Sequence, residues 1–341
     1  ALGSFATNLA TLVSANIEGY DAQTIIAPGF DASNIADLDP PNTLYHPEVL
    51  AGIISQAYNS GTAYVILDSG VGDTAFPSDV GLGYGTGLKL HSGTTPGGAT
   101  LYSWANTEDE HYGIYFPDVY VASAYYLATA NTVGSAALTA YVPPSVKLLR
   151  TFAENDKTVG QWAAPAGTTR GTLFNAGDPA IIMSTTQQNN CYRSDAAATD
   201  HGINPIIKVR NEGTLAWGQK TQQAYDVTTW GATGHSLMHR TNVRRLVGEI
   251  YSHVKTVGQR FVFEPNDGIT WSKFKQAIRP KFEEIKSKQG LNDYRIVIDS
   301  SLNTAAVIAN NIMKVLIKVQ PTPTAEFLDV VISVHTLSDT L

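Results

Sequence analysis

HRTNVRRLVGEIYSHVKTVGQRFVFEPNDGITWSKFKQAI, residues 239–278, is the stretch with the clearest periodicity in this chain of 341 residues. Apolar residues recur at three- and four-residue steps in its first half, which predicts an amphipathic helix with one face in a core. That face consists of Val243, Leu246, Val247, Ile250, Tyr251, Val254 and Val257. A second helix is predicted after FVFEPND, and its apolar face is formed by Trp271, Phe274, Ile278, Phe282 and Ile285.

The phrase FVFEPND, residues 261–267, joins the two predicted helices. Proline is tolerated where a helix begins, so Pro265 fits the entry turn. Asn and Asp side chains accept hydrogen bonds from the first free amides of a helix, so Asn266 or Asp267 is the expected cap. The residues to which we assign a structural role are Asn242, Glu264, Pro265, Asn266 and Trp271.

Cations gather on the sides of both helices that face away from the apolar stripes: Arg244, Arg245, Lys273, Lys275, Lys281, Lys286 and Lys288. We expect Glu264 to form an ion pair with Arg244 or Arg245 across the two helices. A solvated helix face is the plain alternative for the lysines, because most charged side chains lie in water.

The first half of the chain predicts a parallel sheet. TIIAPGF (residues 24–30) and TAYVILD (residues 62–68) read as buried strands, and the segment at residues 43–61 between them reads as a helix. Strand, helix and strand with short joins form the βαβ unit of a parallel sheet covered on both faces. EHYGIYFPDVYVASA is the expected third strand, and a Gly/Ser/Thr-rich excursion at about residues 69–110 precedes it.

The second half predicts a hairpin and three further strands. The hairpin turns at residues 211–213, and the strands are YRIVID, IMKVLIKV and EFLDVVISVH. The expected fold is therefore α/β in a mixed α+β arrangement. A βαβ-type sheet is followed by a C-terminal region of two amphipathic helices packed on a small sheet. We place the break near residue 200, between regions 1–200 and 201–341.

Charge divides the chain at the same place. Residues 1–200 hold six Lys or Arg and 18 Asp or Glu, whereas residues 201–341 hold 17 and 12. The net charge of −7 argues against a nucleic-acid partner. Cys191 is the single cysteine, so no internal disulfide forms and a reduced compartment is expected. No apolar run reaches the roughly 20 residues that span a bilayer, so membrane insertion is not expected.

Motifs for catalysis or cofactor binding fail on spacing. GLGYGTG, residues 81–87, lacks the sixth-position glycine of a dinucleotide loop, and GHSLM, residues 234–238, lacks the closing glycine of a nucleophile elbow. One cysteine and scattered histidines build no zinc site. We therefore assign no catalytic, cofactor or metal-binding residue. Asp68, at a strand end where α/β enzymes bind ligands, and His111, beside Glu108, Asp109 and Glu110, are the positions on which a hydrolase would rest.

Phrases along nearly the whole chain resemble the contractile tail sheath proteins of phages and related injection machines. NVRRL followed by FVFEPN carries most of this resemblance. The matching phrases are TIIAPG, YVILD, GIYFPDVYV, VPPSV, WAAPAG, GINPI, AWGQKT, NVRRLVGEI, FVFEPND with its following TW, and AEFLDVVISV. Residues 69–110 and 170–200 match weakly.

The resemblance implies a mechanical rather than an enzymatic role. Such subunits stack as six-fold rings around a tube, assemble in an extended state and contract to drive the tube through the host envelope. The implied partners are copies of itself, the tail tube protein, and the baseplate and tail terminator proteins. The implied location is the virion tail, after assembly in the host cytoplasm. This chain does not begin with the N-terminal arm of the family, so it resembles a core fragment and we expect it to be a monomer.

Two assembly surfaces follow from the resemblance. The seven cations named above lie in the region that in this family faces the tube or a neighbouring subunit, and an acidic tube would attract them. The last two strands are the expected surface for strand exchange between subunits, with one face formed by Leu328, Val330, Ile332 and Val334. An internal hairpin is the alternative for these strands. The competing functions are another self-assembling shell or adhesin-like protein, and a hydrolase.

Overall fold

The computed structural model describes residues 23–31, 47–68, 109–121, 140–185, 188, 203–223 and 236–326. In chain order, its elements are β1 (Thr24–Asp31), α2 (Pro47–Ser60), β2 (Tyr64–Asp68), η2 (Asp109–His111), β3 (Tyr112–Phe116), β4 (Val119–Val121), β5 (Ala140–Val142), α4 (Pro144–Thr158), α5 (Gly167–Arg170), β6 (Ile203–Val209), β7 (Gly213–Ala216), η4 (Leu237–His239), α8 (Thr241–Gly258), η5 (Gln259–Phe261), α9 (Gly268–Ser287), β8 (Leu291–Val297), α10 (Ala305–Ala309) and β9 (Leu316–Pro321).

A five-stranded sheet with the order β1-β2-β3-β6-β7 organises the first part of the molecule. Strands β1, β2, β3 and β6 are parallel, and β7 returns antiparallel to β6. The predicted βαβ unit is confirmed, because α2 connects the parallel pair β1 and β2. The third predicted strand is also confirmed: β3 pairs parallel with β2, with Val65 opposite Tyr112.

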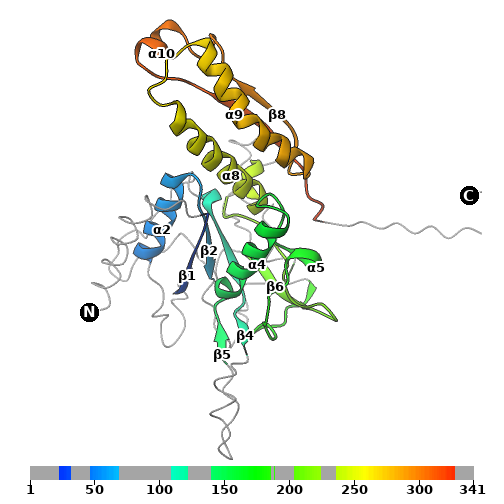
Figure 1. The fold of residues 1–341 in the computed structure, drawn as a ribbon. Coiled ribbons are helices and arrows are strands. Elements are labelled where there is room, and N and C mark those ends of the chain that lie inside the picture. The colour runs from blue at the N-terminus through cyan, green and yellow to red at the C-terminus, as the bar shows by residue number, and fades with distance from the viewer. Residues whose placement is uncertain are drawn as a thin grey trace, which may run out of the picture.

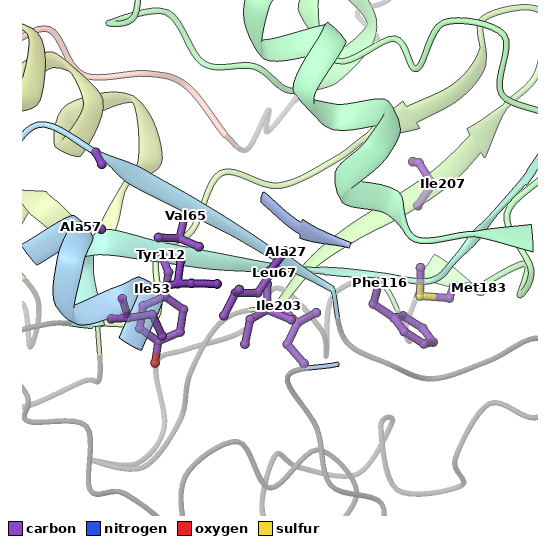
Figure 2. Packing of buried hydrophobic residues seen from close by; sticks show 13 residues of the cluster. Ala27, Ile53, Ala57, Val65, Leu67, Tyr112, Phe116, Met183, Ile203 and Ile207 are labelled. Carbon is purple, nitrogen blue, oxygen red and sulfur yellow. The ribbon is translucent and has the colours of Figure 1, made fainter. Parts of the chain in front are cut away.

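Both faces of this sheet are covered, which explains why its central strands are apolar at consecutive positions. One face packs against α2, and Figure 2 shows Ile53 and Ala57 of that helix beside Val65, Leu67 and Tyr112. The other face packs against α4 through a cluster that includes Ile66, Tyr115, Leu148 and Phe152. Strands β2 and β3 are buried at every residue.

The predicted hairpin at residues 211–213 is present as β6 and β7. Asn211 and Gly213 have φ values of 69° and 88°, which are the left-handed conformations that a tight turn needs. Through β6, this hairpin joins the sheet formed by earlier strands, since Ile203 lies opposite Ile114. The division of the chain near residue 200 stays a prediction.

The C-terminal part consists of α8, α9 and the antiparallel pair β8–β9, and it extends away from the five-stranded sheet (Figure 1). One apolar cluster joins α8, α9 and the pair, with Leu246, Phe274, Ile278 and Ile296 among its buried members. The mixed fold class, with two amphipathic helices on a small sheet, is confirmed. Tyr251 was assigned to the core stripe of α8, but its side chain is half exposed and lies against Gly61.

Several predicted segments lie outside the described residues. They are the glycine motif at residues 81–87, the excursion as far as residue 108, Cys191, and the strand EFLDVVISVH from residue 327 onward.

Candidate functional site

The turn FVFEPND fixes the start of α9, as predicted. The Asp267 carboxylate accepts a 2.8 Å hydrogen bond from the Thr270 amide, so Asp267 is the cap. Asn266 has a different role: its Oδ1 accepts from the Trp271 indole at 2.8 Å, and its Nδ2 donates to the Ile312 carbonyl at 2.9 Å. The turn is therefore tied both to α9 and to the segment before β9.

The first two turns of α8 lie against the five-stranded part of the molecule, and polar contacts cross the junction. The Tyr64 hydroxyl and the Thr241 hydroxyl are 2.9 Å apart and buried. Burial raises the pKa of Tyr64 well above its ordinary value, so this phenol stays neutral. Asn242 Nδ2 donates to the Trp162 carbonyl at 3.2 Å. Asn242 is thus part of this junction.

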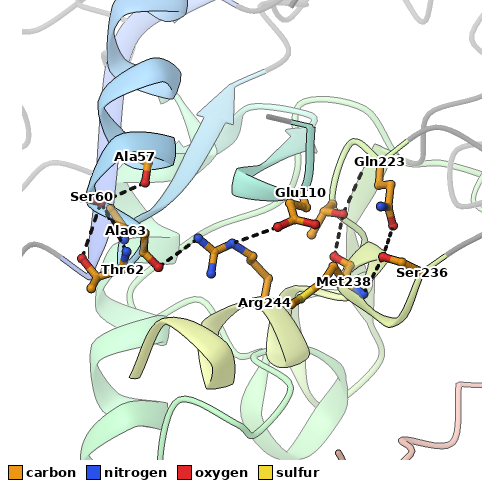
Figure 3. Close-up of polar contacts among 11 residues, drawn as sticks. Ala57, Ser60, Thr62, Ala63, Glu110, Gln223, Ser236, Met238 and Arg244 are labelled. Atoms are coloured by element: carbon orange, nitrogen blue, oxygen red, sulfur yellow. Dashed lines mark hydrogen bonds and ion pairs between the residues drawn. The ribbon is translucent and has the colours of Figure 1, made fainter. Parts of the chain in front are cut away.

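Arg244 is buried in the junction, as Figure 3 shows, between Glu110 and the turn that follows Ser60. Its Nη2 donates to the Gly61 carbonyl at 3.2 Å, and its Nε lies 4.0 Å from Glu110 Oε1. Burial raises the pKa of Glu110, and the guanidinium opposes that shift. Burial likewise lowers the pKa of Arg244, and Glu110 opposes it. The pair holds η2 to α8.

Arg245 makes the second cationic contact across the junction. Its side chain is 1% exposed, and Nη2 donates to Asp156 of α4 at 2.5 Å. The expected pairing of Glu264 with Arg244 or Arg245 is wrong, because Glu264 is exposed in the α8–α9 turn. Both arginines contact carboxylates of the five-stranded part instead, Glu110 and Asp156. The spacing of residues along α8 does not show that this helix also contacts the five-stranded part.

The predicted lysines of α9 lie on its outer side, but three are already paired. Lys281 contacts Glu249 at 2.8 Å, Lys286 contacts Asp293 at 2.9 Å, and Lys288 contacts Glu284 at 2.8 Å. Within the described part of the chain, Lys273 and Lys275 are exposed and make no ion pair. A count of cations along α9 does not include the carboxylates that pair with them, which lie on α8, on α9 itself and on β8.

Strand β8 pairs with β9 along one edge, and within residues 236–326 its other edge has no partner strand. A groove of about 490 Å³ follows β8, between this strand and α9. Consecutive residues from Asp293 to Asp299 line it, as expected where a groove runs along a strand edge. Lys275, Arg279 and Lys286 form the α9 wall. An unpaired strand edge is a template for another strand.

The residues on which a hydrolase would rest are not brought together. Asp68 is buried at the carboxyl end of β2, where its oxygens accept from the amide and hydroxyl of Ser145 at 2.8 and 2.6 Å. His111 is buried at the opposite end of the parallel strand β3, edge-on to Tyr58 with ring centroids 5.3 Å apart. Asp68 anchors the start of α4, which is a structural role.

The described ranges contain neither a cluster of metal-binding side chains nor a membrane-spanning helix. No group of three His, Cys, Asp or Glu there is arranged to hold a metal ion. None of the helices described is long and apolar enough to cross a membrane.

Residues 234–335 match the family model for the phage tail sheath C-terminal domain. This part of the chain is similar to a tail sheath C-terminal domain, and we refer to it below as the sheath domain. The sheath domain contains the α8–α9 pair, the FVFEPND turn and the β8–β9 pair described above. The resemblance to contractile tail sheath proteins is therefore confirmed.

Two tail sheath proteins illustrate the relationship. The one from Vibrio phage KVP40 is 28% identical over 190 residues, which are 55% of this chain and 26% of the relative. The one from Enterobacteria phage T4 is 26% identical over 181 residues, which are 53% of this chain and 25% of the relative. The matched segment spans about a quarter of the length of these relatives.

Solved structures share the fold. The anti-feeding prophage helical sheath in its contracted state aligns with a TM-score of 0.64 at 20% identity, over 95% of this chain and 73% of that chain. The sheath complex of an extracellular contractile injection system, PVC, aligns in its contracted state with a TM-score of 0.58 at 19% identity. That alignment covers 82% of this chain and 68% of that one. The sheath domain and the five-stranded part thus occur together in other proteins.

Proposed function

We propose that the protein is a structural subunit of a contractile tail sheath, not an enzyme. In this function, copies form stacked six-fold rings around a tail tube and contract to drive it through a host envelope. The observation that carries the proposal is the match to a tail sheath C-terminal domain whose β8 edge, within residues 236–326, has no partner strand and lies beside a groove. The fold shared with contracted sheaths supports it.

Strand addition at β8 would link subunits while they move. Backbone hydrogen bonds to an edge strand keep two subunits connected even when their other surfaces slide past each other. The neighbour's strand would be residues 327–334, in which Leu328, Val330, Ile332 and Val334 alternate with Asp329, Val331 and Ser333. Such alternation suits a strand with one face on the apolar core and one in water.

The buried junction supports movement of each subunit as one body. The buried side chains of Arg244, Arg245 and Tyr64 tie α8 to the five-stranded part. Breaking a buried ionic contact is costly, so relative motion is expected at subunit surfaces rather than inside the subunit. Contraction would then exchange one arrangement of rigid subunits for another.

The tube contact rests on Lys273 and Lys275 in this proposal. Both are exposed and, among the residues that the structure describes, form no ion pair. Arg244 and Arg245, which are buried, and Lys281, Lys286 and Lys288, which are paired, would contribute less to an acidic tube surface. Exposed ion pairs stabilise a contact by at most about 1 kcal/mol each. Such pairs would position a ring of subunits on the tube and still break when the sheath contracts.

The further partners are the baseplate and the tail terminator, and the location is the virion tail after assembly in the host cytoplasm. Electron microscopy of the protein expressed from its complete reading frame tests the proposal. We expect striated hollow tubes, and uniformly discrete particles under all assembly conditions would contradict it. The 341-residue chain alone is expected to be monomeric in dilute solution, which size-exclusion chromatography checks.

Strand addition has its own test in the same protein. Replacing Leu328, Val330, Ile332 and Val334 together by Ser should abolish tubes, because the added strand loses its apolar face. The matched control changes the alternate positions, with Asp329→Asn and Ser333→Thr, and should still assemble. Circular dichroism spectra must match for the two variants. Tubes from the quadruple variant would show that this strand is not the link.

A further inference from the structure

An apolar knob protrudes from the α8–α9 turn. Phe263 is fully exposed and has a φ of 73°, a left-handed conformation that is strained for a bulky residue. Val262 before it, Ile269 in the first turn of α9 and Ile312, whose carbonyl accepts from Asn266, are 59%, 66% and 47% exposed. Water contact with four large apolar side chains in one place is unfavourable, and strain held at such a place commonly marks a binding surface.

The knob is held rigid by the polar contacts of the turn. The Glu264 amide donates to the Phe261 carbonyl at 3.3 Å, and the Asp267 amide to the Pro265 carbonyl at 3.0 Å. Asn266 ties the turn to Ile312, as described above. A shape that is fixed before binding loses little conformational entropy on contact, so the turn suits insertion into a pocket.

A pocket lies at the other end of the molecule, beside α5. It encloses about 470 Å³, and its lining is mixed: Ala164, Ala166, Gly167, Trp217, Gly218 and Ala325 are apolar or small, and Arg170, Gln188, Gln219, Thr324 and Glu326 are polar. Its wall includes the Trp217 side chain, which is 43% exposed. Trp217 and the small residues beside it offer an apolar wall to an aromatic guest, and the polar residues of the lining offer partners to its polar neighbours. We call this cavity the socket.

The knob and the socket carry complementary charges. Glu264 is exposed next to Phe263 and has no ion pair within the described residues. Arg170 is exposed at the socket, where its Nε donates to the Ala164 carbonyl at 3.2 Å, and it likewise forms no ion pair there. The other charged group in the socket wall, Glu326, already pairs with Arg240. Arg170 is thus left to meet an acidic partner.

We propose that the knob of one copy inserts into the socket of the next, with Glu264 meeting Arg170. The α8–α9 turn is at the end of the helix pair that is away from the sheet, whereas α5 lies beside the sheet (Figure 1). A contact between different surfaces at opposite ends repeats from copy to copy and builds an open or closed polymer. The inference adds a specific contact to the proposed sheath function, and it rests on that function for its biological setting.

Cross-linking between two cysteine variants tests the contact and leaves Phe263 and Trp217 intact. One protein carries Val262→Cys and the other Ala166→Cys, both with Cys191→Ser, and only one bears an affinity tag. Mild oxidation of the mixture should give the mixed disulfide in about tenfold excess over either homodimer, which corresponds to ~1.4 kcal/mol of preference. A statistical mixture, or a dominant homodimer of Val262→Cys, would overturn the proposal.

Three further variants distinguish insertion from chance collision. Phe263→Ser should remove the excess of mixed disulfide. Glu264→Arg or Arg170→Glu alone should reduce it, and mixing the two swapped proteins should restore it. Persistence of the excess in Phe263→Ser would contradict insertion. If complete sheaths assemble without this cross-link, the knob–socket contact is wrong and the sheath function stands. If copies cross-link but form no tubes, the contact stands and the sheath function is wrong.

Discussion

The guanidinium carbon of Arg245 lies 4.7 Å from the centroid of the Phe152 ring, so a cation of α8 is stacked on an aromatic side chain of α4. Arg245 is also the largest of the fully buried side chains in the described residues. A cation enclosed in this way is stable only while its ring and its carboxylate partner both remain in place. The sheath domain is therefore attached to the five-stranded part by charge as well as by apolar packing.

Removal of the partner carboxylate should destabilise the protein. Asp156→Ala leaves the Arg245 cation buried without its ion pair, and we expect a loss of ~2 kcal/mol in the free energy of unfolding. Asp178→Ala is the control, because Asp178 pairs with Lys208 where both side chains are about half exposed. The control should change stability by less than about 1 kcal/mol. Urea denaturation measures both, and equal losses would contradict the role of burial.

A glycine on α8 sets how closely the helix approaches the turn before β2. A Cβ added at Gly248 would lie 2.6 Å from the Thr62 carbonyl oxygen, which is backbone and cannot rotate away. Gly248→Ala should therefore lower the melting temperature even though alanine favours helix. At Gly258, the nearest atom is 3.9 Å from the added Cβ. Gly258→Ala should be neutral or stabilising by up to about 1 kcal/mol, and thermal unfolding of both variants decides.

The buried carboxylate of Asp68 should act in folding and not in catalysis. Asp68→Ala leaves the amide and hydroxyl of Ser145 without their acceptor, and we expect a loss of ~2 kcal/mol in unfolding free energy. Ser145→Ala removes one of the two hydrogen bonds and should cost less. Hydrogen exchange at the first amides of α4 should quicken in both variants. Unchanged stability in Asp68→Ala would reopen a functional role for this residue.

Periodicity predicted the elements that bury a single continuous face. The stripe Phe274, Ile278, Phe282 and Ile285 placed α9 correctly, and capping chemistry narrowed the cap to Asn266 or Asp267, of which Asp267 is the cap. The partners of Arg244 and Arg245 were missed because Glu110 and Asp156 are distant in sequence and only the tertiary fold brings them close.

The paired lysines illustrate the same limit. Lys288 has its carboxylate, Glu284, four residues earlier on α9, and this spacing is readable from sequence. Lys286 meets Asp293 across the turn into β8, and Lys281 meets Glu249 of α8. Those two pairs depend on how α9 packs against its neighbours. Net charge along a predicted helix therefore overestimates the charge that remains available to a partner.

Stability should also fall in weakly acidic solution because of His253 on α8. Burial lowers the pKa of His253 below its ordinary value, the nearby Lys281 ammonium lowers it further, and Glu249 and Glu284 oppose the shift. The unfolded chain therefore takes up a proton at this residue first, as the pH falls through about 6.5. The free energy of unfolding should decrease from there until the folded pKa is reached, and then level off. Urea denaturation at several pH values between about 7.5 and 5 measures the decrease.

The His253→Gln variant separates this effect from other titrations. Glutamine keeps a polar side chain without a proton equilibrium, so the variant should lose less stability than the natural protein over the same interval. Glu110 acts with the opposite sign, because burial raises its pKa and protonation then favours the folded state. That contribution is common to both proteins and cancels in their difference. The carboxylates with lowered pKa values act only at lower pH; they are Asp267, Glu283, Glu284, Asp293 and Asp299. Parallel curves for the two proteins would show that His253 does not contribute.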